Sequence, residues 1–416
     1  MSNDNIFNSK TNPIPPLRPD LEVVPIRENG NDYLYFHDQR QYATSDLALR
    51  REIESLLSLI DGHKSINDLE SYLGEDISKD ELLDFIKFLD KNRLLYSDYF
   101  KTYADKTENN YEERSVHSSV TAGRSYPSDP DELAPLLDNA FAGCESAASE
   151  SHGSPRALYA PHIDPQVAMN RYAEAFATIK EIKPQRVVVL ATAHYAGLYP
   201  DLYEDHPFIL VNKDFELPLG DIKCDRETVN KLSKASDCGI TLRDRAHRME
   251  HSIELPLLFL SYLWKHDFTV VPFLVSGLQE LMYMEEGHHG TLVERFSTLL
   301  ADEFTEDEET FFLISGDLSH FGRKFGDEEA ATAMFEEVGN FDEQFLEYGV
   351  RNDPSGMLQL ISEDLDPYRI CGFPPLYTFL KSMPGLKGTK LNYDLWDERE
   401  RKSAVTFGSI LYSVKK

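Results

Sequence analysis

The residues after about position 155 alternate short apolar runs with longer stretches in which apolar positions recur at helical spacing. The runs are rich in β-branched and aromatic residues, as in strands buried on both faces of a parallel sheet. They cover residues 157–160, 186–190, 268–274, 311–314 and 405–412. The helical stretches cover residues 129–139, 168–182, 225–235, 253–264, 292–300, 328–346 and 354–361. This alternation predicts an α/β domain that contains βαβ units.

The N-terminal part of the chain has a different pattern. Two short β-type runs, 21–26 and 33–36, flank Asn29-Gly30, which is a strong hairpin signal. Three helical stretches follow, over residues 49–60, 65–73 and 78–89, the second closed by Gly74 and the third opened by a capping box of Ser78 and Glu81. This order predicts a small winged-helix-like α+β domain over residues 20–100.

Two polar segments border this small domain. Residues 1–19 are rich in Asn, Pro and Ser without periodicity, so we expect a disordered arm. Residues 101–116 are polar and aperiodic and are interpreted as a linker, which leaves residues 117–416 for the α/β domain. Residues 142–154 are mostly small and are interpreted as a loop.

Composition narrows the classes of partner and compartment. The 416 residues include 72 acidic and 42 basic ones, for a formal net charge of -30. This charge repels phosphate backbones and anionic lipid, so we expect neither nucleic-acid nor membrane binding. No apolar run approaches the ~18 residues of a membrane span, and the first residues lack the apolar core of a signal peptide. We therefore expect a soluble, cytoplasmic protein whose four cysteines, which form no CxxC pair, make no disulfide framework.

Three of the apolar runs lead into a histidine. Residues 157–160 precede His162, residues 186–191 precede His194, and residues 311–314 precede His320. In open α/β sheets ligands bind beyond the carboxyl ends of the strands. If the three strands are parallel neighbours, the three imidazoles meet at one edge, which is how metal and acid/base sites are commonly assembled.

Further polar residues could join this edge, although each has an ordinary structural explanation when taken alone. Asp164 follows His162 closely enough to orient it or to bind the same ion. Cys371 lies at a turn before a predicted helix, where a thiol can ionise, yet an isolated cysteine is more often a small core residue. Glu250 and Glu254 near a helix start are favoured by the helix dipole alone.

Six ordered motifs make the second domain resemble the Memo family, also called AmmeMemoRadiSam system protein B, over residues 117–416. They are Ala122-Gly-Arg-Ser-Tyr-Pro127, Ala160-Pro-His162, Ala193-His194, Glu250-His-Ser-Ile-Glu254, Ser315-Gly-Asp-Leu-Ser-His-Phe-Gly322 and Cys371-Gly372. The resemblance implies an α/β core similar to that of the class III extradiol dioxygenases. It also implies a metal held by His162, His194 and Cys371, with iron or copper as the expected ion and zinc as an alternative.

By the same resemblance, His320 falls where the extradiol enzymes keep a general base, with Asp317 as its partner and His251 at the rim. The chain departs from the family at two positions. Asp164 stands in a motif that usually reads Ala-Pro-His-Ala-Gly-Tyr, and Tyr195 replaces the second of two histidines. Asp164 therefore adds a candidate carboxylate ligand, and Tyr195 removes an imidazole.

The first domain resembles the PqqD-like peptide-recognition domain over residues 20–97. The resemblance rests on the order of its elements and on the segments 59–66 and 88–95. It implies a peptide ligand that adds a strand to an exposed sheet edge.

The sequence supports three functional hypotheses, of which the first two are the main ones. The first is a metal-dependent oxidoreductase with dioxygenase-like chemistry on a substrate that the sequence does not identify, a peptide being one candidate. The second is a non-catalytic peptide-binding adaptor that works with a radical-SAM enzyme. Hydrolysis at a zinc site, with Asp164 as the carboxylate base, is the third.

Overall fold

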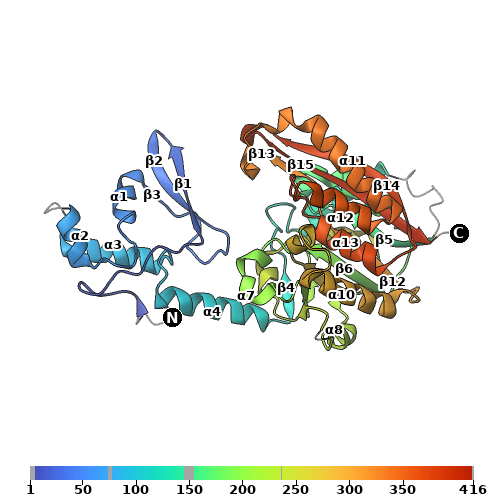
Figure 1. Cartoon of the computed structure of the whole chain (residues 1–416), viewed down its shortest axis with the longest axis horizontal. Coiled ribbons are helices and arrows are strands. Elements are labelled where there is room, and N and C mark those ends of the chain that lie inside the picture. Colours follow the sequence, from blue (N-terminus) through green and yellow to red (C-terminus); the bar gives the residue numbers. More distant parts are fainter. Residues whose placement is uncertain (1–4, 74–76, 145–153, 236, 415–416) are drawn as a thin grey trace. The chain divides into compact units, whose positions relative to one another are not determined.

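The protein is described by a computed structural model that covers residues 5–73, 77–144, 154–235 and 237–414. The chain forms two compact units, Met1–Glu113 and Arg114–Lys416 (Figure 1). The predicted helix stop at Gly74 and most of the predicted loop at 142–154 lie outside the described residues.

The N-terminal unit contains a three-stranded antiparallel sheet in the order β1-β2-β3. Its strands are β1 (Leu21–Glu28), β2 (Asn31–Asp38) and β3 (Ala48–Arg50). Asn29 and Gly30, with φ of 50° and 80°, form the predicted tight turn between β1 and β2. The helices are η2 (Arg51–Ile53), α1 (Glu54–Leu57), α2 (Ile66–Leu73), α3 (Lys79–Lys91) and α4 (Asp98–Glu112). The helix predicted over 49–60 is wrong at its start, because residues 49 and 50 belong to β3.

Two expectations for the flanking segments are also wrong. Residues 5–19 are not a disordered arm: Ile14 is buried in the core of the unit and Leu17 forms a β-bridge with Leu95. Residues 101–112 are not an aperiodic linker, since they continue α4, whose first turn is capped by the Ser97 hydroxyl. Both segments are polar and are anchored by single apolar side chains at irregular spacing. Their sequences therefore show no helical or strand periodicity.

Arg18 ties these segments to the small sheet. Its side chain is fully buried and donates hydrogen bonds to Asp38 of β2 (2.8 Å) and to Asp20 (2.7 Å). Its guanidinium also lies 4.2 Å from the ring centre of Phe100 in α4. One buried cation therefore joins the N-terminal segment, the hairpin and the helix.

The larger unit is built on a ten-stranded mixed sheet in the order β10-β7-β11-β6-β12-β5-β15-β13, with β14 paired to β15 and β9 to β11. Four neighbouring strands are parallel: β11 (Thr269–Val275), β6 (Arg186–Thr192), β12 (Thr310–Ser315) and β5 (Ser154–Ala160). On one side the sheet continues antiparallel through β15 (Ser403–Val414), β14 (Lys387–Glu398) and β13 (His320–Gly322).

Shorter strands extend the other side or lie apart from the sheet. They are β7 (Phe208–Leu210), β10 (Ile240–Thr241), β9 (Lys223–Cys224) and the separate parallel pair β4 (Val116–Ser118) and β8 (Asp214–Glu216). Short helical turns connect the elements at α7 (Pro200–Tyr203), η4 (Ala196–Leu198), η5 (Arg245–Met249), η6 (Gln279–Met282), η7 (Arg323–Phe325), η8 (Ala331–Ala333) and η9 (Arg399–Arg401).

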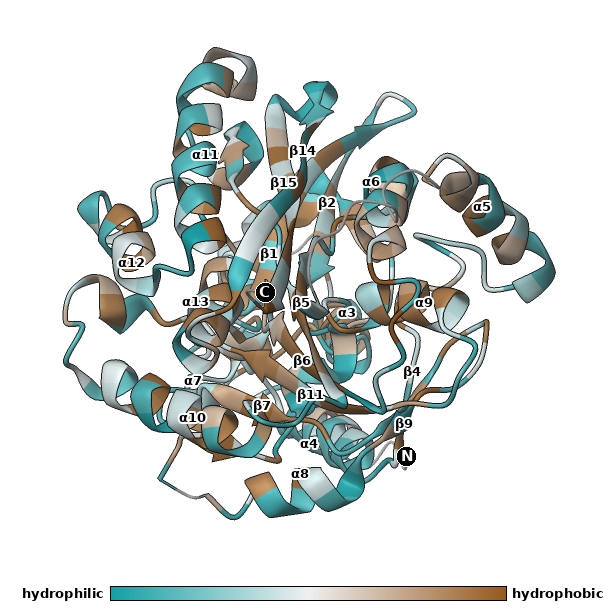
Figure 2. Ribbon diagram, turned by 90° about the vertical axis from the view of Figure 1, so that its right-hand side faces the viewer, coloured by the Kyte–Doolittle hydropathy of each residue, from teal (hydrophilic) through white to brown (hydrophobic). Residues whose placement is uncertain are grey.

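Helices cover both faces of the large sheet (Figure 2). One face packs against α5 (Pro130–Ala142), α6 (Pro165–Ala177) and α9 (Glu254–Leu263). The other packs against α8 (Arg226–Leu232), α10 (His288–Phe304), α11 (Phe335–Arg351), α12 (Pro354–Glu363) and α13 (Phe373–Ser382). Along β6, Val188 and Leu190 enter one core while Val187 and Val189 enter the other, so the apolar run is buried on both sides. None of the described helices combines the length and apolarity needed to cross a bilayer.

We predict that Arg18→Met destabilises the N-terminal unit by about 3 kcal/mol, because it leaves the Asp38 carboxylate buried without a counter-ion. Burial alone raises the pKa of Asp38, but hydrogen bonds from Arg18 and from backbone amides outweigh it and lower that pKa. The stabilisation is therefore present at neutral pH and is lost as the pH falls below about 4.

Hydrogen exchange of peptides from residues 20–100 measures this effect at pH 7, with Arg27→Met as the matched control. Arg27 pairs with Asp32 in the same hairpin, but both side chains are exposed, so its loss should leave exchange unchanged. Equal effects of the two substitutions would contradict the role given to Arg18.

Candidate metal centre

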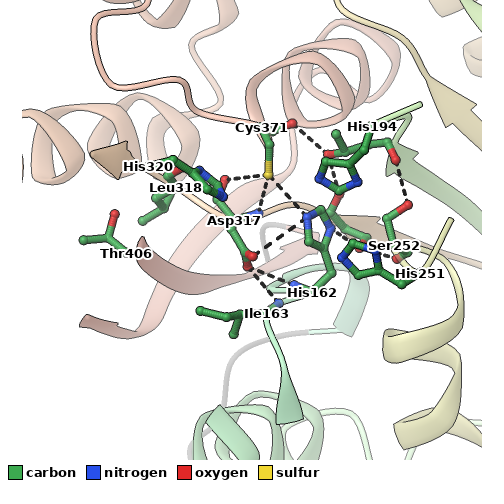
Figure 3. A network of polar contacts seen from close by, with 12 residues as sticks. His162, Ile163, His194, His251, Ser252, Asp317, Leu318, His320, Cys371 and Thr406 are labelled. Atoms are coloured by element: carbon green, nitrogen blue, oxygen red, sulfur yellow. Dashed lines mark hydrogen bonds and ion pairs between the residues drawn. The ribbon is translucent and has the colours of Figure 1, made fainter. Parts of the chain in front are cut away.

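The carboxyl ends of three parallel strands lie level with one another. In the register of the sheet, Ser315 of β12 pairs with Ala160 of β5 on one side and with Ala191 of β6 on the other. His162 follows Ala160 by two residues, and His194 follows Ala191 by three. The strand ends therefore bring these two histidines together as the sequence pattern predicts, with ring centres 4.8 Å apart (Figure 3).

The proton on the ring of His162 is fixed by its neighbours. The ring is buried, and Nδ1 lies 3.1 Å from the Ser315 hydroxyl. That hydroxyl donates its own hydrogen to the Ser252 carbonyl (2.5 Å), so it must accept from Nδ1–H. The lone pair of His162 is consequently on Nε2, which faces Cys371 Sγ at 3.3 Å and Asp317 Oδ2 at 3.8 Å.

Glu250 fixes His194 in the same way. Its carboxylate is fully buried and accepts from both the backbone N–H (2.7 Å) and Nδ1 (2.9 Å) of His194. Burial raises the pKa of Glu250, but His194 and His251 outweigh burial and lower it to about 2. A carboxylate that holds one ring nitrogen and leaves Nε2 free is the usual outer partner of a metal-binding histidine.

His251 lies beside the other two rings. It stacks on His194 with ring centres 5.0 Å apart, and its ring is nearly perpendicular to that of His162. Burial lowers the pKa of His251 to about 4, Glu250 opposes this shift, and His194 adds to it. At neutral pH this imidazole is therefore uncharged and can offer a lone pair.

Cys371 is brought to the site by two glycines that touch. A Cβ added at Gly316 would lie 2.2 Å from Gly372 Cα, and one at Gly372 would lie 2.2 Å from the Tyr159 hydroxyl. This close approach lets the Asp317 N–H donate to Cys371 Sγ (3.3 Å) and the Gly372 N–H donate to the Asp317 carbonyl (2.9 Å). The glycines in the motifs of both loops thus position the thiol.

The donor atoms form two groups that could hold a metal ion, each with all its atoms within 4.8 Å of one another. One group is His162, His194 and His251, and the other is His162, Asp317 and Cys371. The trio expected from the sequence, His162, His194 and Cys371, is split between them. Cys371 still interacts with His194: burial lowers the pKa of that imidazole, but Glu250 and the thiol outweigh burial and raise it.

Asp317 supports the loop after β5. Its buried carboxylate accepts the backbone N–H groups of His162 (2.9 Å) and Ile163 (3.2 Å). Burial raises its pKa to about 7, and those two hydrogen bonds oppose the rise. The predicted pairing of Asp317 with His320 is not what the contacts show, because the His320 ring is oriented by the Leu318 carbonyl, 3.0 Å from Nδ1.

His320 lies at the start of β13, at the edge of the cluster. Burial and the positive charge of His194 together lower its pKa to about 4. Arg369, in the strained left-handed region at φ 56°, donates to the His320 carbonyl and so links this strand to the loop that carries Cys371.

The two altered motif positions have structural roles. Asp164 caps α6 by accepting from the Gln166 N–H (2.8 Å) and also accepts from the Ser125 hydroxyl (2.9 Å). It belongs to neither metal-binding group among the described residues, so the expectation that it adds a ligand is wrong. Tyr195 packs half-buried against the core on the α6 side of the sheet and opens η4.

No local signal in the sequence indicates the roles of the two buried glutamates. Glu250 orients His194, and Glu254 holds the 120–126 segment by accepting from Val120 N–H (2.6 Å), from the Thr121 hydroxyl (2.6 Å) and from the Tyr126 hydroxyl (2.5 Å). The helix dipole alone would account for an acidic residue at either position, so neither residue stands out in the sequence. The one sequence signal for a role at the site is that both glutamates belong to the same motif as His251.

A cavity of about 580 Å³ opens beside the cluster. Thr192, His194 and Cys371 are among its lining residues, and its wall mixes apolar residues with polar ones such as Gln279, His289 and Asp366. A small organic molecule in this cavity would reach the donor atoms directly.

The fold and the cluster define a class: α/β proteins that gather histidine and cysteine donors at the carboxyl edge of a central sheet. The family model described as "Memo-like protein" matches residues 117–411. This match covers well over half of the chain, and the chain belongs to the Memo family.

Relatives in distant organisms are consistent with this. A "MEMO1 family protein" of Aquifex aeolicus is 29% identical over 369 residues, which cover 87% of this chain and 91% of the relative. A "MEMO1 family protein" of Thermus thermophilus is 26% identical, with 80% and 94% covered, and the "Protein memo-1 homolog" of Caenorhabditis elegans is 25% identical, with 55% and 61% covered. The Aquifex alignment is longer than the family match, so it extends into the N-terminal unit.

We predict that Gly372→Ala destabilises the protein by about 1–3 kcal/mol, because the added methyl overlaps the Tyr159 hydroxyl and the Asp317 carbonyl. Gly339→Ala is the matched control: it lies within α11 with open space around it, so it should be neutral or stabilise by up to about 1 kcal/mol. Urea unfolding followed by circular dichroism measures both. A Gly372→Ala protein as stable as the control would contradict the close packing of the two loops.

Proposed function

We propose that this protein binds one redox-active metal ion, iron or copper, at the cluster of His162, His194 and Cys371 and uses it in oxidoreductase chemistry of the dioxygenase type. The observation that carries the proposal is the fixed orientation of two imidazoles. Ser315 and Glu250 each occupy an Nδ1, so each ring has its Nε2 left to give to an ion, and His194 would release its extra proton when the ion binds.

The donor set fits the ion. Bound to an ion, two imidazoles and one thiolate would suit iron, copper or zinc, and such a set leaves coordination positions open for a substrate or a small oxidant. Bound iron or copper would supply one-electron chemistry at these open positions. The neighbouring cavity, which reaches His194 and Cys371, gives a substrate access.

The remaining residues have supporting roles in this proposal. His320 is uncharged at neutral pH, because burial and the charge of His194 hold its pKa near 4, and its Nδ1 contacts a carbonyl. It therefore acts as a proton acceptor through Nε2. Asp317 keeps the His162 loop in place through two backbone hydrogen bonds.

We predict that purified wild-type protein retains close to one iron or copper ion per chain and that His194→Ala loses most of it, because one imidazole ligand is gone. The measurement is inductively coupled plasma mass spectrometry of protein purified without chelators. His288→Ala is the control, since His288 is exposed and pairs with Asp205 away from the cluster. Equal metal content in the two variants would refute the proposed ligand role of His194.

A second candidate function, a peptide-binding adaptor for a radical-SAM enzyme, is supported by the N-terminal unit. β1 is an edge strand of the small sheet, and Val23 and Val24 on it are 42% and 40% exposed. An exposed apolar edge strand is a template for an added peptide strand.

For this second function we predict that short fluorescein-labelled peptides of random sequence bind the full chain and that Val24→Lys weakens binding at least about tenfold, since charge on an edge strand opposes strand addition. Fluorescence anisotropy measures binding, and Tyr72→Lys is the control at an exposed residue of α2. Oxygen uptake that depends on bound metal supports the oxidoreductase instead. Binding that is equal in wild type and Val24→Lys would contradict recognition at β1.

A further inference from the structure

We propose that the cavity beside the cluster selects substrates that carry a primary ammonium group, and that Asp366 is the residue that recognises this group. This substrate preference rests on the proposed oxidoreductase function and adds to it the chemical class of the substrate and one specificity-determining residue. The preference follows from the charged groups on the cavity wall and from the hydrogen bonds that these groups already make.

The wall of the cavity offers carboxylates, while its positively charged side chains are already paired. Asp366 and Glu204 are among the lining residues. Arg369 also lines the cavity, but its guanidinium donates to the Asp327 carboxylate at 2.5 Å. The imidazole of His194 already has a buried carboxylate beside its Nδ1. A bound anion would therefore meet carboxylates on the wall and no unpaired arginine or lysine among the described lining residues.

The loop that carries Asp366 holds it in a fixed position. Leu365, Asp366 and Arg369 have φ of 57°, 55° and 56°, a left-handed conformation that strains non-glycine residues and is concentrated at binding and active sites. Asp366 Oδ1 accepts the N–H of Ile370 (3.0 Å), and the Asp366 carbonyl accepts the N–H of Arg369 (3.1 Å). Ile370 directly precedes Cys371, so these contacts also fix the carboxylate relative to the thiol.

The other carboxylate oxygen of Asp366 has no partner in the described part of the chain. Asp366 is half-buried, and its Oδ2 accepts no hydrogen bond from the described residues. Burial raises the pKa of Asp366, and the Ile370 N–H and the charge of Arg369 oppose that rise. A partly desolvated carboxylate with one open oxygen gains most from a cationic donor, because charge-assisted hydrogen bonds are stronger than neutral ones. A primary ammonium supplies three N–H donors and no acceptor.

The cavity has room for more than the ammonium group. Its volume is about 580 Å³, and Leu278, Met282 and Phe373 give it apolar wall that an apolar body can contact. Cys371 lines the same cavity, so an amine bound at Asp366 shares this space with a ligand of the proposed ion. The formal net charge of -30 attracts cations to the protein and repels anions. We therefore expect the substrate to be a small amine with an apolar body.

Isothermal titration calorimetry of the full-length protein tests this preference with three ligands that share one skeleton: 2-phenylethylamine, 2-phenylethanol and phenylacetate. The amine should bind at least about tenfold more tightly than the alcohol, and phenylacetate should bind most weakly, because a hydrogen bond between charged groups adds about tenfold or more in affinity. Asp366→Asn should weaken binding of the amine at least about tenfold and change binding of the alcohol less than about threefold. The asparagine carbonyl can still accept the Ile370 N–H, so the loop should keep its fold.

Asp364→Asn is the matched control, since Asp364 is an exposed carboxylate of the same loop that is not among the cavity's lining residues. It should leave all three affinities unchanged, and circular dichroism should show that both variants are folded. Equal binding of the three ligands, no binding of any of them at millimolar concentration, or an Asp366→Asn protein that keeps wild-type affinity for the amine would overturn the inference.

Titrations before and after chelator treatment separate this inference from the proposed function. A preference that comes from Asp366 should survive removal of metal, whereas an amine that binds only to the ion would lose its affinity and overturn the inference. Metal content is measured in the same samples by inductively coupled plasma mass spectrometry. Absence of metal from the untreated protein would refute the proposed function alone, and a lost amine preference in protein that retains metal would refute the role of Asp366 alone.

Discussion

The hydrogen bond between His162 Nδ1 and the Ser315 hydroxyl is the contact on which the candidate centre depends. Ser315 is the last residue of β12, and its hydroxyl hydrogen is already donated to the Ser252 carbonyl, so the bond can form only when His162 carries its proton on Nδ1. Nε2 is then presented to the thiol and to the carboxylate of the neighbouring loops. The other tautomer of His162 would leave its buried Nδ1 without a hydrogen-bond donor. The ring therefore keeps a single tautomer and orientation.

The large sheet explains why this contact can exist. Three parallel strands end at the same level, so the loops after them converge, and the touching glycines 316 and 372 let the Cys371 loop lie directly on the Asp317 loop. Glu250 and Glu254 then anchor the surrounding segments from one short stretch before and at the start of α9. The centre is thus held by strand ends, by backbone hydrogen bonds and by two buried carboxylates rather than by any single element.

Much of this arrangement could be predicted from the sequence, and the limits have physical causes. Apolar runs that stop at His162 and His194 predicted both the strands and their convergence. The role of Glu250 could not be predicted, because a carboxylate at a helix start has an adequate local explanation and its burial is a tertiary property. Polar β14 and α4 were missed for a similar reason: each is stabilised by pairing or by anchors distant in sequence, such as the Arg18–Phe100 contact. The carboxylate of Asp164, a candidate ligand from the sequence, instead caps α6 through the Gln166 N–H and accepts from the Ser125 hydroxyl, a partner far away along the chain.

The Memo-family domain therefore uses its motif residues in three physical roles, which are to orient an imidazole, to join two loops and to anchor a segment. The most direct measurement is a crystal structure of protein soaked with copper, with the ion located by anomalous scattering. We expect one ion about 2.0–2.3 Å from His162 Nε2, with the Ser315 contact to Nδ1 intact. An ion elsewhere, or one bound through Nδ1 with Ser315 displaced, would contradict this role of His162.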